Sequence, residues 1–363
     1  MIRIPKNIES LEAYKPGKTI SQIIDELSLT RTAVLWNNEN NFGCSPKAKK
    51  KMNEVLDDLH LYPDPHSISL CSKIAKINNI KSTQVVVGNG SEGLLQNIIR
   101  AFCEGQDEVL TFHGTFVIIY VWSKLNDTLC KKVSLTDTYE FDLQSILDQI
   151  TSNTKIIYLS NPNNPTGTII STEILRSFMA KVPKDIIVVL DEAYYEYARE
   201  ISELYPNSIS HNYSNMLTLR TFSKVYGLAG MRIGYAMGPQ DLISSLMKVK
   251  LTFEPSIIAQ AAGEGAIEDY TFIEKTVVNN REQLQLFYQT FDRLNISYVP
   301  SFANFVMIDM VKPEIANDLF KKLLNKGVFV RVITSFGLPH CIRITIGTPK
   351  ENELFLATLE SII

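Results

Sequence analysis

The sequence predicts an α/β fold: a large domain with a mostly parallel, helix-covered sheet, plus a smaller α+β domain. Three observations support this prediction. The length of 363 residues exceeds what one ordinary core accommodates. Short apolar runs rich in β-branched residues alternate with helical patterns through most of the chain. After about residue 250 the pattern changes to short strands and two or three longer helices.

These changes of pattern predict three parts. Residues 1–45 form an N-terminal arm that contributes to the small domain, 46–250 the large domain, and 251–363 the small α+β domain. The arm contains Gly17-Lys18-Thr19, which resembles the end of a phosphate-binding loop. That loop requires a glycine five residues before Gly17, where this chain has Glu12, so the phosphate-loop interpretation is rejected.

The large domain alternates helices and strands in chain order. Helices are expected at 47–59, 70–77 and 94–102, and strands at 84–88, 108–112, 155–159, 185–190, 216–219 and 233–237. In the small domain we expect helices at 270–294, 315–326 and from 350, with strands at 296–299, 305–310, 328–332 and 341–346. Ligands of open parallel sheets bind at the carboxyl ends of the strands, which directs attention to the polar segments there.

Composition excludes several classes of function. A formal net charge of -3 without a long basic run gives no reason to expect nucleic acid or an anionic membrane as partner. The five cysteines are dispersed, as in a reduced cytoplasmic protein, and no apolar run reaches membrane-spanning length. The five histidines lack metal-ligand spacing, so we expect no metal.

The stretch from Arg220 to Arg232 carries the main chemical signal. It follows the strand at 216–219 and contains Lys224, which two hydroxyl residues, Thr221 and Ser223, closely precede. A lysine amine forms Schiff bases with carbonyl compounds, while hydroxyls and an arginine hold an anion. The stretch therefore favours a carbonyl cofactor that carries a phosphate. A solvated surface lysine in a polar loop is the alternative.

A glycine-rich turn, Gly88-Asn-Gly-Ser-Glu-Gly93, joins a strand to a helix. Amides at a helix N-terminus, here those of Ser91 and Glu92, can receive a phosphate. The same spacing fits a dinucleotide site, but the ribose-binding acid expected after the next strand is replaced by Phe112-His-Gly-Thr-Phe116. A purely structural turn is the other alternative.

Two further strand ends carry polar groups. Asp191 ends a buried strand and precedes Tyr194, and a buried carboxylate needs a partner, for which a protonated ring nitrogen is suitable. A helix-capping role is the alternative for Asp191. The loop Asn161-Pro-Asn-Asn-Pro-Thr-Gly167 can present the amide of Asn164 to a ligand, or it is an ordinary turn. Arg343 and Arg331 in the small domain could clamp a carboxylate or phosphate, or form surface ion pairs.

The ordered set Asn161-Pro-Asn-Asn-Pro-Thr-Gly167, Asp191-Glu-Ala-Tyr194 and Thr221-Phe-Ser-Lys224 with Gly227-Leu-Ala-Gly-Met-Arg232 resembles class I/II (fold type I) pyridoxal-phosphate-dependent aminotransferases. Nearly the whole chain is similar to the histidinol-phosphate aminotransferase branch. The pieces typical of that branch are Tyr14-Lys-Pro-Gly-Lys18, Asn38-Glu-Asn40, Tyr62-Pro-Asp64, Gly88-Asn-Gly-Ser91, Ser301-Phe-Ala-Asn-Phe305 and Arg343-Ile-Thr-Ile-Gly-Thr348.

The resemblance implies an aspartate-aminotransferase-like fold, pyridoxal 5'-phosphate as cofactor, and a homodimer with shared active sites. It gives Lys224 the Schiff base with the cofactor and the proton transfer. Asp191 would pair with the ring nitrogen, and Asn164 and Tyr194 would bind the phenolic oxygen. The remaining implied cofactor residues are Ser91, Glu92, Phe116, Thr221, Ser223, Arg232 and, from the neighbouring subunit, Tyr62; the implied substrate residues are Tyr14, Asn40, Arg331 and Arg343.

The activity implied is a ping-pong transamination in histidine biosynthesis, from histidinol phosphate and 2-oxoglutarate to imidazole acetol phosphate and glutamate. An aromatic or other amino-acid aminotransferase, a phospho-amino-acid decarboxylase and a non-catalytic pyridoxal-phosphate-binding protein stay open as alternatives. The chain departs from the branch pattern at Asn41 (usually proline), at Glu92-Gly93, at Phe116 (often tyrosine) and at Thr252-Phe-Glu-Pro255. These departures leave Lys224 and Asp191 intact but leave the substrate open.

Overall fold

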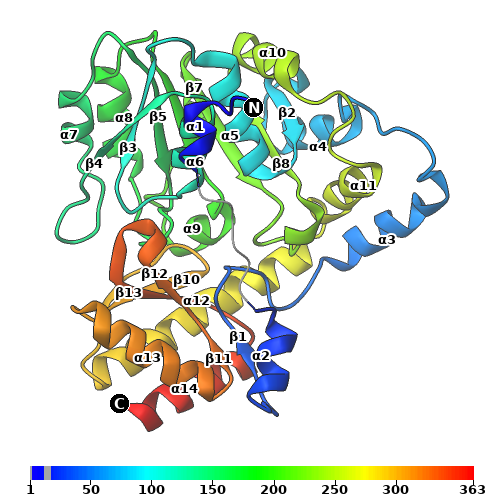
Figure 1. The fold of residues 1–363 in the computed structure, drawn as a ribbon. Helices are drawn as coiled ribbons and strands as arrows, with labels where there is room; N and C mark the ends of the chain where they lie inside the picture. Colours follow the sequence, from blue (N-terminus) through cyan, green and yellow to red (C-terminus); the bar gives the residue numbers. More distant parts are fainter. Residues whose placement is uncertain (1, 12–17) are drawn as a thin grey trace.

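The large domain is built on a mixed, mostly parallel sheet covered by helices. The structure, a computed structural model, describes residues 2–11 and 18–363, and Figure 1 shows the large domain above the small one. The seven strands lie in the order β2-β8-β7-β6-β5-β3-β4. Their bounds are Val85–Gly88 (β2), Glu108–Phe112 (β3), Leu129–Val133 (β4), Thr154–Ser160 (β5), Ile187–Asp191 (β6), Met216–Thr221 (β7) and Gly234–Met237 (β8).

Both faces of this sheet are buried, because side chains alternate along each strand. In β5, Ile156 and Tyr158 pack on one face with helices α5 and α10, while Ile157 and Leu159 pack on the other with α7 and α8. Strands β7, β6, β5, β3 and β4 run parallel, and β8 is antiparallel to β2 and β7. The helices of this part are α3 (Pro46–Glu54), α4 (Ile68–Asn78), α5 (Gly90–Phe102), α6 (Ile118–Leu125), α7 (Leu143–Asp148), α8 (Thr172–Lys181), α9 (Tyr195–Ile201), α10 (Gln240–Val249) and α11 (Ile257–Ala266).

The small domain contains a four-stranded antiparallel sheet in the order β12-β13-β10-β9. A short parallel pair, β1 (Ala33–Val34) with β11 (Val328–Phe329), joins the N-terminal arm to it. The other elements of this domain are α2 (Ile20–Glu26), α12 (Tyr270–Arg293), β9 (Ser297–Val299), β10 (Phe305–Asp309), α13 (Pro313–Asn325), β12 (Arg331–Ile333), β13 (Leu338–Thr345) and α14 (Pro349–Ile362). Helix α1 (Lys6–Glu9) instead packs against α6 of the large domain.

The predicted fold class is confirmed, and three local expectations are corrected. The strand expected at 328–332 is two short strands, β11 and β12, that belong to different sheets. The helix expected at 47–59 ends at Glu54 and is followed by a separate 3₁₀ turn, Leu56–Asp58. Strand β4 was not predicted, because Lys131 and Lys132 interrupt its apolar pattern at the edge of the sheet, where charged residues are common.

The two domains are joined by polar contacts as well as by the chain. The Tyr139 hydroxyl, from the loop before α7, donates to Asp309 at the end of β10 at 2.6 Å and lies 3.1 Å from His340 Nε2 in β13. Helix α11 packs against α3 and α4, so the chain beyond 250 continues in the large domain before α12 begins. The predicted boundaries at 45 and 250 stay predictions. Among residues 2–11 and 18–363, no helix has the length and apolar character that a membrane span requires.

Candidate active site

A cavity of about 230 Å³ lies at the carboxyl ends of β5, β6 and β7, beside the first turn of α5. Parallel strands present their last side chains at one edge of a sheet, which is why distant motifs meet here. Besides five other residues, the lining contains ten of the residues singled out from the sequence: Ser91, Glu92, Phe116, Asn164, Asp191, Tyr194, Thr221, Ser223, Lys224 and Arg232.

Lys224 projects into the cavity from the turn that follows β7. The side chain is half-buried, and its Nζ donates to the carbonyl oxygen of Asn37 at 3.3 Å. Burial, together with the nearby positive charges of Arg343 and Arg232, lowers the pKa of Lys224 to about 8 against the opposing effect of Glu39. A larger fraction of the amine is therefore neutral near pH 7 than for an ordinary lysine, as a nucleophile requires.

We expect the reaction of Lys224 with a small aldehyde to speed up with rising pH and to level off above about pH 8. Only the neutral amine attacks a carbonyl, and an unperturbed lysine would still gain reactivity up to about pH 10.4. Reductive trapping of the purified chain followed by peptide mass spectrometry measures this midpoint at Lys224 alone. An exposed lysine such as Lys248 serves as the internal control. A midpoint shared by both lysines would contradict the assignment.

Asp191 closes the deep end of the cavity. It is 2% exposed, and its Oδ2 accepts a hydrogen bond from the Tyr158 hydroxyl at 3.0 Å. Its Oδ1 has no hydrogen-bond partner within the described part of the chain. Burial raises the pKa of Asp191 to about 6, against the lowering effect of the Tyr158 hydrogen bond. A cationic N–H group in the cavity would satisfy Oδ1 and favour the charged carboxylate.

Tyr194 and Asn164 each accept a hydrogen bond from a residue that does not line the cavity, and each keeps a hydrogen-bond donor for a ligand. The Tyr194 hydroxyl accepts from the amide of Asn38 at 2.9 Å, which leaves its own proton for another acceptor. Asn164 accepts from Arg343 Nη1 through Oδ1 at 2.6 Å, which leaves its Nδ2 hydrogens. An oxygen ligand placed between them would receive two hydrogen bonds.

The other end of the cavity is suited to an anion. Helix α5 begins at Gly90, so the amides of Ser91 and Glu92 are among the first-turn donors that lack helical acceptors. The Thr221 and Ser223 hydroxyls lie 3.0 Å apart, and Arg232 Nη2 lies 3.4 Å from Glu92 Oε2. Arg232 adopts a left-handed backbone conformation with φ of 49°, a strained geometry that is concentrated at functional sites.

The remaining predicted residues lie outside the cavity lining. Arg343 is buried and reaches the cavity through its contact with Asn164, whereas Arg331 is exposed, with Nη1 3.5 Å from Asn37 Oδ1. The structure does not bring Asn40 into the cavity: its amide donates to the Val225 carbonyl and to Thr276. Tyr62 is 78% exposed and does not line the cavity, and Tyr14 lies outside the described residues.

Sequence reasoning missed several contributors. Asn37 and Glu39 line the cavity, and Asn38 supports Tyr194. Tyr158 supports Asp191. A tyrosine within an otherwise aliphatic buried strand needs a partner for its hydroxyl, which was the available signal for Tyr158. The arm residues gave no such signal, because their contacts depend on the tertiary fold.

Comparison with known proteins places this geometry in a family. The family model for aminotransferases of class I and II matches residues 33–359. The histidinol-phosphate aminotransferase of Brevibacillus brevis is 40% identical over 361 residues, which cover 99% of this chain and 98% of the relative. The enzyme of the same name from Bacillus subtilis is 37% identical, with 100% of both chains covered.

Solved structures agree with these relatives. The histidinol-phosphate aminotransferase of Sinorhizobium meliloti, in complex with pyridoxal-5'-phosphate, superposes with a TM-score of 0.90 at 27% identity, covering 100% of this chain and 99% of the other. The aspartate aminotransferase of Thermus thermophilus has the same fold, with a TM-score of 0.84 at 20% identity and 100% of both chains covered. The chain therefore belongs to the class I and II aminotransferase family.

Proposed function

We propose that this chain is a pyridoxal-phosphate-dependent transaminase that exchanges the amino group of histidinol phosphate with 2-oxoglutarate, forming imidazole acetol phosphate and glutamate in histidine biosynthesis. The observation that carries the chemistry is one cavity that combines a lysine of lowered pKa, a buried carboxylate with a free oxygen and a helix N-terminus. The choice of substrate is supported by full-length relatives that bear the name histidinol-phosphate aminotransferase.

The residues present fit pyridoxal phosphate. When bound, this cofactor supplies a carbonyl carbon for an amine and a ring that withdraws electrons. Asp191 would hold the proton on the ring nitrogen through its free Oδ1, and Tyr194 and Asn164 would donate to the phenolic oxygen. Phe116 would stack on the ring, and the phosphate would be held by the α5 amides of Ser91 and Glu92 with Thr221, Ser223 and Arg232.

Lys224 performs the acid and base work in this proposal. An amine whose pKa lies near 8 both takes and returns a proton at neutral pH, which is the condition for efficient general acid–base catalysis. Arg343 binds the anionic group of the substrate. Its guanidinium is buried, it donates to Asn164 and to the Trp36 carbonyl at 2.9 Å, and its Nε has no partner in the described structure. Arg331, on the neighbouring strand, adds a second positive charge.

Steady-state kinetics with several amino donors test the substrate. We expect the highest kcat/KM for histidinol phosphate, because a phosphate dianion gains more from the paired arginines than a carboxylate does. Phenylalanine and tyrosine are the competing donors. A clear preference for either of them would replace the proposal by an aromatic aminotransferase. Absence of any half-reaction would favour a non-catalytic binding protein, and release of carbon dioxide a decarboxylase.

We further propose a homodimer with shared active sites. Tyr62 is 78% exposed and stacks on Phe253 at 4.2 Å, and the exposed apolar side chains Leu61, Ile68 and Leu251 are close to this pair in sequence. A second copy would cover these side chains, and its site would receive Tyr62. The five free cysteines support a reducing, cytoplasmic location.

Subunit mixing tests the shared site. Lys224→Ala and Tyr62→Ala variants are each expected to have low activity, and a mixture should regain part of it. In a hybrid dimer both defects fall on the same site, and the other site is intact. Light scattering should give about twice the chain mass of 41.0 kDa. A monomeric mass, or a mixture no more active than its parts, would count against the shared site.

A further inference from the structure

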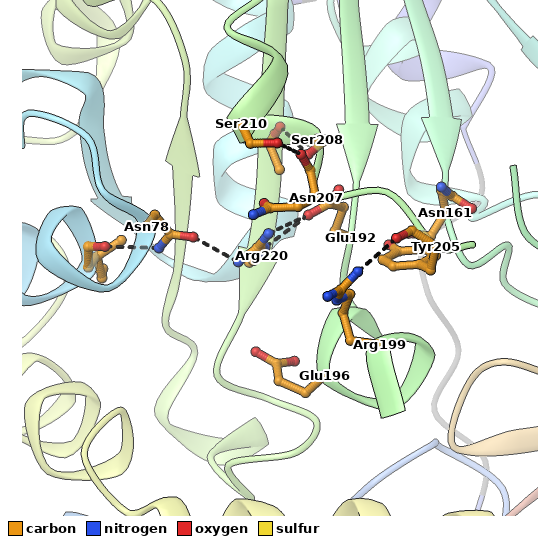
Figure 2. A network of polar contacts seen from close by, with 12 residues as sticks. Asn78, Asn161, Glu192, Glu196, Arg199, Tyr205, Asn207, Ser208, Ser210 and Arg220 are labelled. Carbon is orange, nitrogen blue, oxygen red and sulfur yellow. Dashed lines mark hydrogen bonds and ion pairs between the residues drawn. The ribbon is translucent and has the colours of Figure 1, made fainter. Parts of the chain in front are cut away.

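A buried ion pair links the ends of strands β6 and β7 (Figure 2). Arg220 lies in β7, and Glu192 directly follows β6. Their side chains are only 5% and 0% exposed. Both Nε and Nη2 of Arg220 lie 2.9 Å from Glu192 Oε2. Neither residue lines the cavity, so the proposed chemistry leaves the pair unexplained.

Alternation of side chains explains why the pair lies behind the site. Ile187 and Val189 of β6 pack on the α5 face of the sheet, so Asp191 points to the same face. Leu190 packs on the other face, which is therefore the face of Glu192. The same alternation sends Thr221 toward the cavity and Arg220 away from it. Each residue of the ion pair is thus a direct neighbour in sequence of a residue in the cavity wall.

The backbone ladder connects the two positions. Asp191 is in register with Leu219, and the Glu192 amide donates to the Leu219 carbonyl at 2.8 Å. The strands are therefore still paired where Asp191 ends β6 and where β7 leads into the turn with Lys224. The ion pair adds a side-chain contact between the two strand ends.

Arg220 also contacts two helices. Its Nη1 donates to Asn78 Oδ1 at 3.0 Å, at the end of α4, and its guanidinium carbon lies 3.3 Å from the ring centre of Tyr195, the first residue of α9. Four segments therefore meet at one planar group whose donors have fixed directions. A lysine at this position could not make these contacts together.

Stability alone is a weak explanation for such a pair. Removing two charges from water costs several kcal/mol for each ion, and well-packed apolar residues of similar volume often stabilise a protein equally well. A forked guanidinium differs from an apolar contact in that it fixes distance and direction. The Asp191 carboxylate and the Lys224 amine need fixed relative positions, because both must contact the same cofactor ring.

We propose that Arg220 and Glu192 are positioning residues, whose ion pair sets the spacing between Asp191 and the turn from Thr221 to Lys224. The inference rests on the proposed function, because the spacing matters only for a ligand that bridges these two places. It goes beyond that function by assigning a role to residues that touch neither cofactor nor substrate.

An apolar double variant, Arg220→Met with Glu192→Leu, separates positioning from stability. It removes both partners of the pair together, and Glu196, which Arg220 also faces, keeps its hydrogen bond from the Tyr226 hydroxyl, so the cofactor-free chain should unfold at nearly the same temperature as the unaltered chain. We expect kcat to fall about 100-fold, the loss that a displacement near 1 Å can cause. The affinity of the cofactor-free chain for pyridoxal phosphate, measured by fluorescence titration, should also fall, while KM stays nearly unchanged.

A second ion pair in the same sheet provides the matched control. Lys131 Nζ lies 2.8 Å from Glu108 Oε2 between β4 and β3, at the opposite end of the strands from the cavity. The variant Lys131→Met with Glu108→Leu should keep both kcat and cofactor affinity. Arg220→Lys keeps the charge but loses the fork, so its kcat and affinity should lie between those of the double variant and the unaltered chain. If the double variant does not fold, the kcat and cofactor affinity of Arg220→Lys are compared with those of the unaltered chain instead.

The proposal is overturned if the double variant keeps its kcat and cofactor affinity, whatever happens to its unfolding temperature. It is equally overturned if Arg220→Lys unfolds at a lower temperature with cofactor affinity unchanged. Turnover of histidinol phosphate by the unaltered chain tests the proposed function by itself. Cofactor affinity is compared between variants without any substrate, so a wrong substrate assignment leaves the test of positioning intact.

Discussion

Replacement of Lys224 by alanine is expected to lower kcat by at least about 10⁴-fold, because it removes both a covalent attachment and a proton-transfer group. Among residues 2–11 and 18–363, Lys224 is the one lysine that lines the cavity, so no other amine of this lining takes over. The stability of the fold and the affinity for the cofactor should decrease much less than kcat. The phosphate end of the site, with the α5 amides and Arg232, does not include Lys224. Single-turnover measurements with histidinol phosphate and visible spectra of the reconstituted variant check both expectations.

Lys248→Ala is the control for this experiment, since Lys248 is exposed on α10 and remote from the cavity lining. It should keep full activity. If Lys224→Ala retained even a tenth of the normal turnover, Lys224 would not be the residue that bonds to the cofactor and moves the proton.

The second large effect is expected for Asp191→Asn. An amide has no negative charge to hold a proton on the ring nitrogen, and loss of one preorganised electrostatic contact costs about 10²–10³-fold in kcat. We expect the upper end of this range, because Asp191 is buried and its Oδ1 has no other partner in residues 2–11 and 18–363. Asp185→Asn, at an exposed position just before β6, is the matched control and should leave kcat unchanged.

The same substitution should stabilise the cofactor-free chain at neutral pH. Burial raises the pKa of Asp191 from 3.8 to about 6. The folded chain therefore holds a proton that the unfolded chain has lost between these values, and stability falls as the pH rises through that window. Asparagine escapes this loss, so Asp191→Asn should gain up to about 3 kcal/mol above pH 6. Urea unfolding at pH 4 and pH 7 measures it. If the variant and the unaltered chain were equally stable at both pH values, the charged form of Asp191 would not destabilise the fold, and its raised pKa would be refuted.

The fold was largely predictable because its strands are short, buried and apolar on both faces. For runs such as those of β3 and β5, few conformations other than a strand bury so many β-branched side chains. The failures occurred where burial is partial. Edge strand β4 has a half-exposed pattern, and helix α5 begins with glycines whose low helix propensity hides its start. That start is the point at which an anion would be held, so local propensity failed at a proposed functional position.

The candidate site was predictable where its residues end strands. Asp191 ends β6, and Asn164 and Lys224 follow β5 and β7. Parallel strands bring such positions together without further information. Asn38 was not predictable in this way. Its hydrogen bond to Tyr194 spans 156 residues and depends on how the arm crosses between the domains. Similarly, the spatial neighbours of Arg220 come from the connection between β6 and α9 and from the end of α4, and no local pattern around Arg220 indicates them.

The pairing of β1 with β11 has a consequence for biosynthesis. Ala33 pairs with Val328, and the Leu35 carbonyl accepts from the Thr345 amide, so the arm that carries Asn37 and Glu39 into the cavity wall has its strand partners near the C-terminus. Contacts so distant in sequence form late, because their loop closure costs entropy before any contact repays it. We expect a nascent chain arrested before Val328 to protect the central strands from protease but leave residues 33–40 open to cleavage. The sheet of the large domain would thus form early during synthesis, and the cofactor cavity would be completed only after residues 328–345 have emerged from the ribosome.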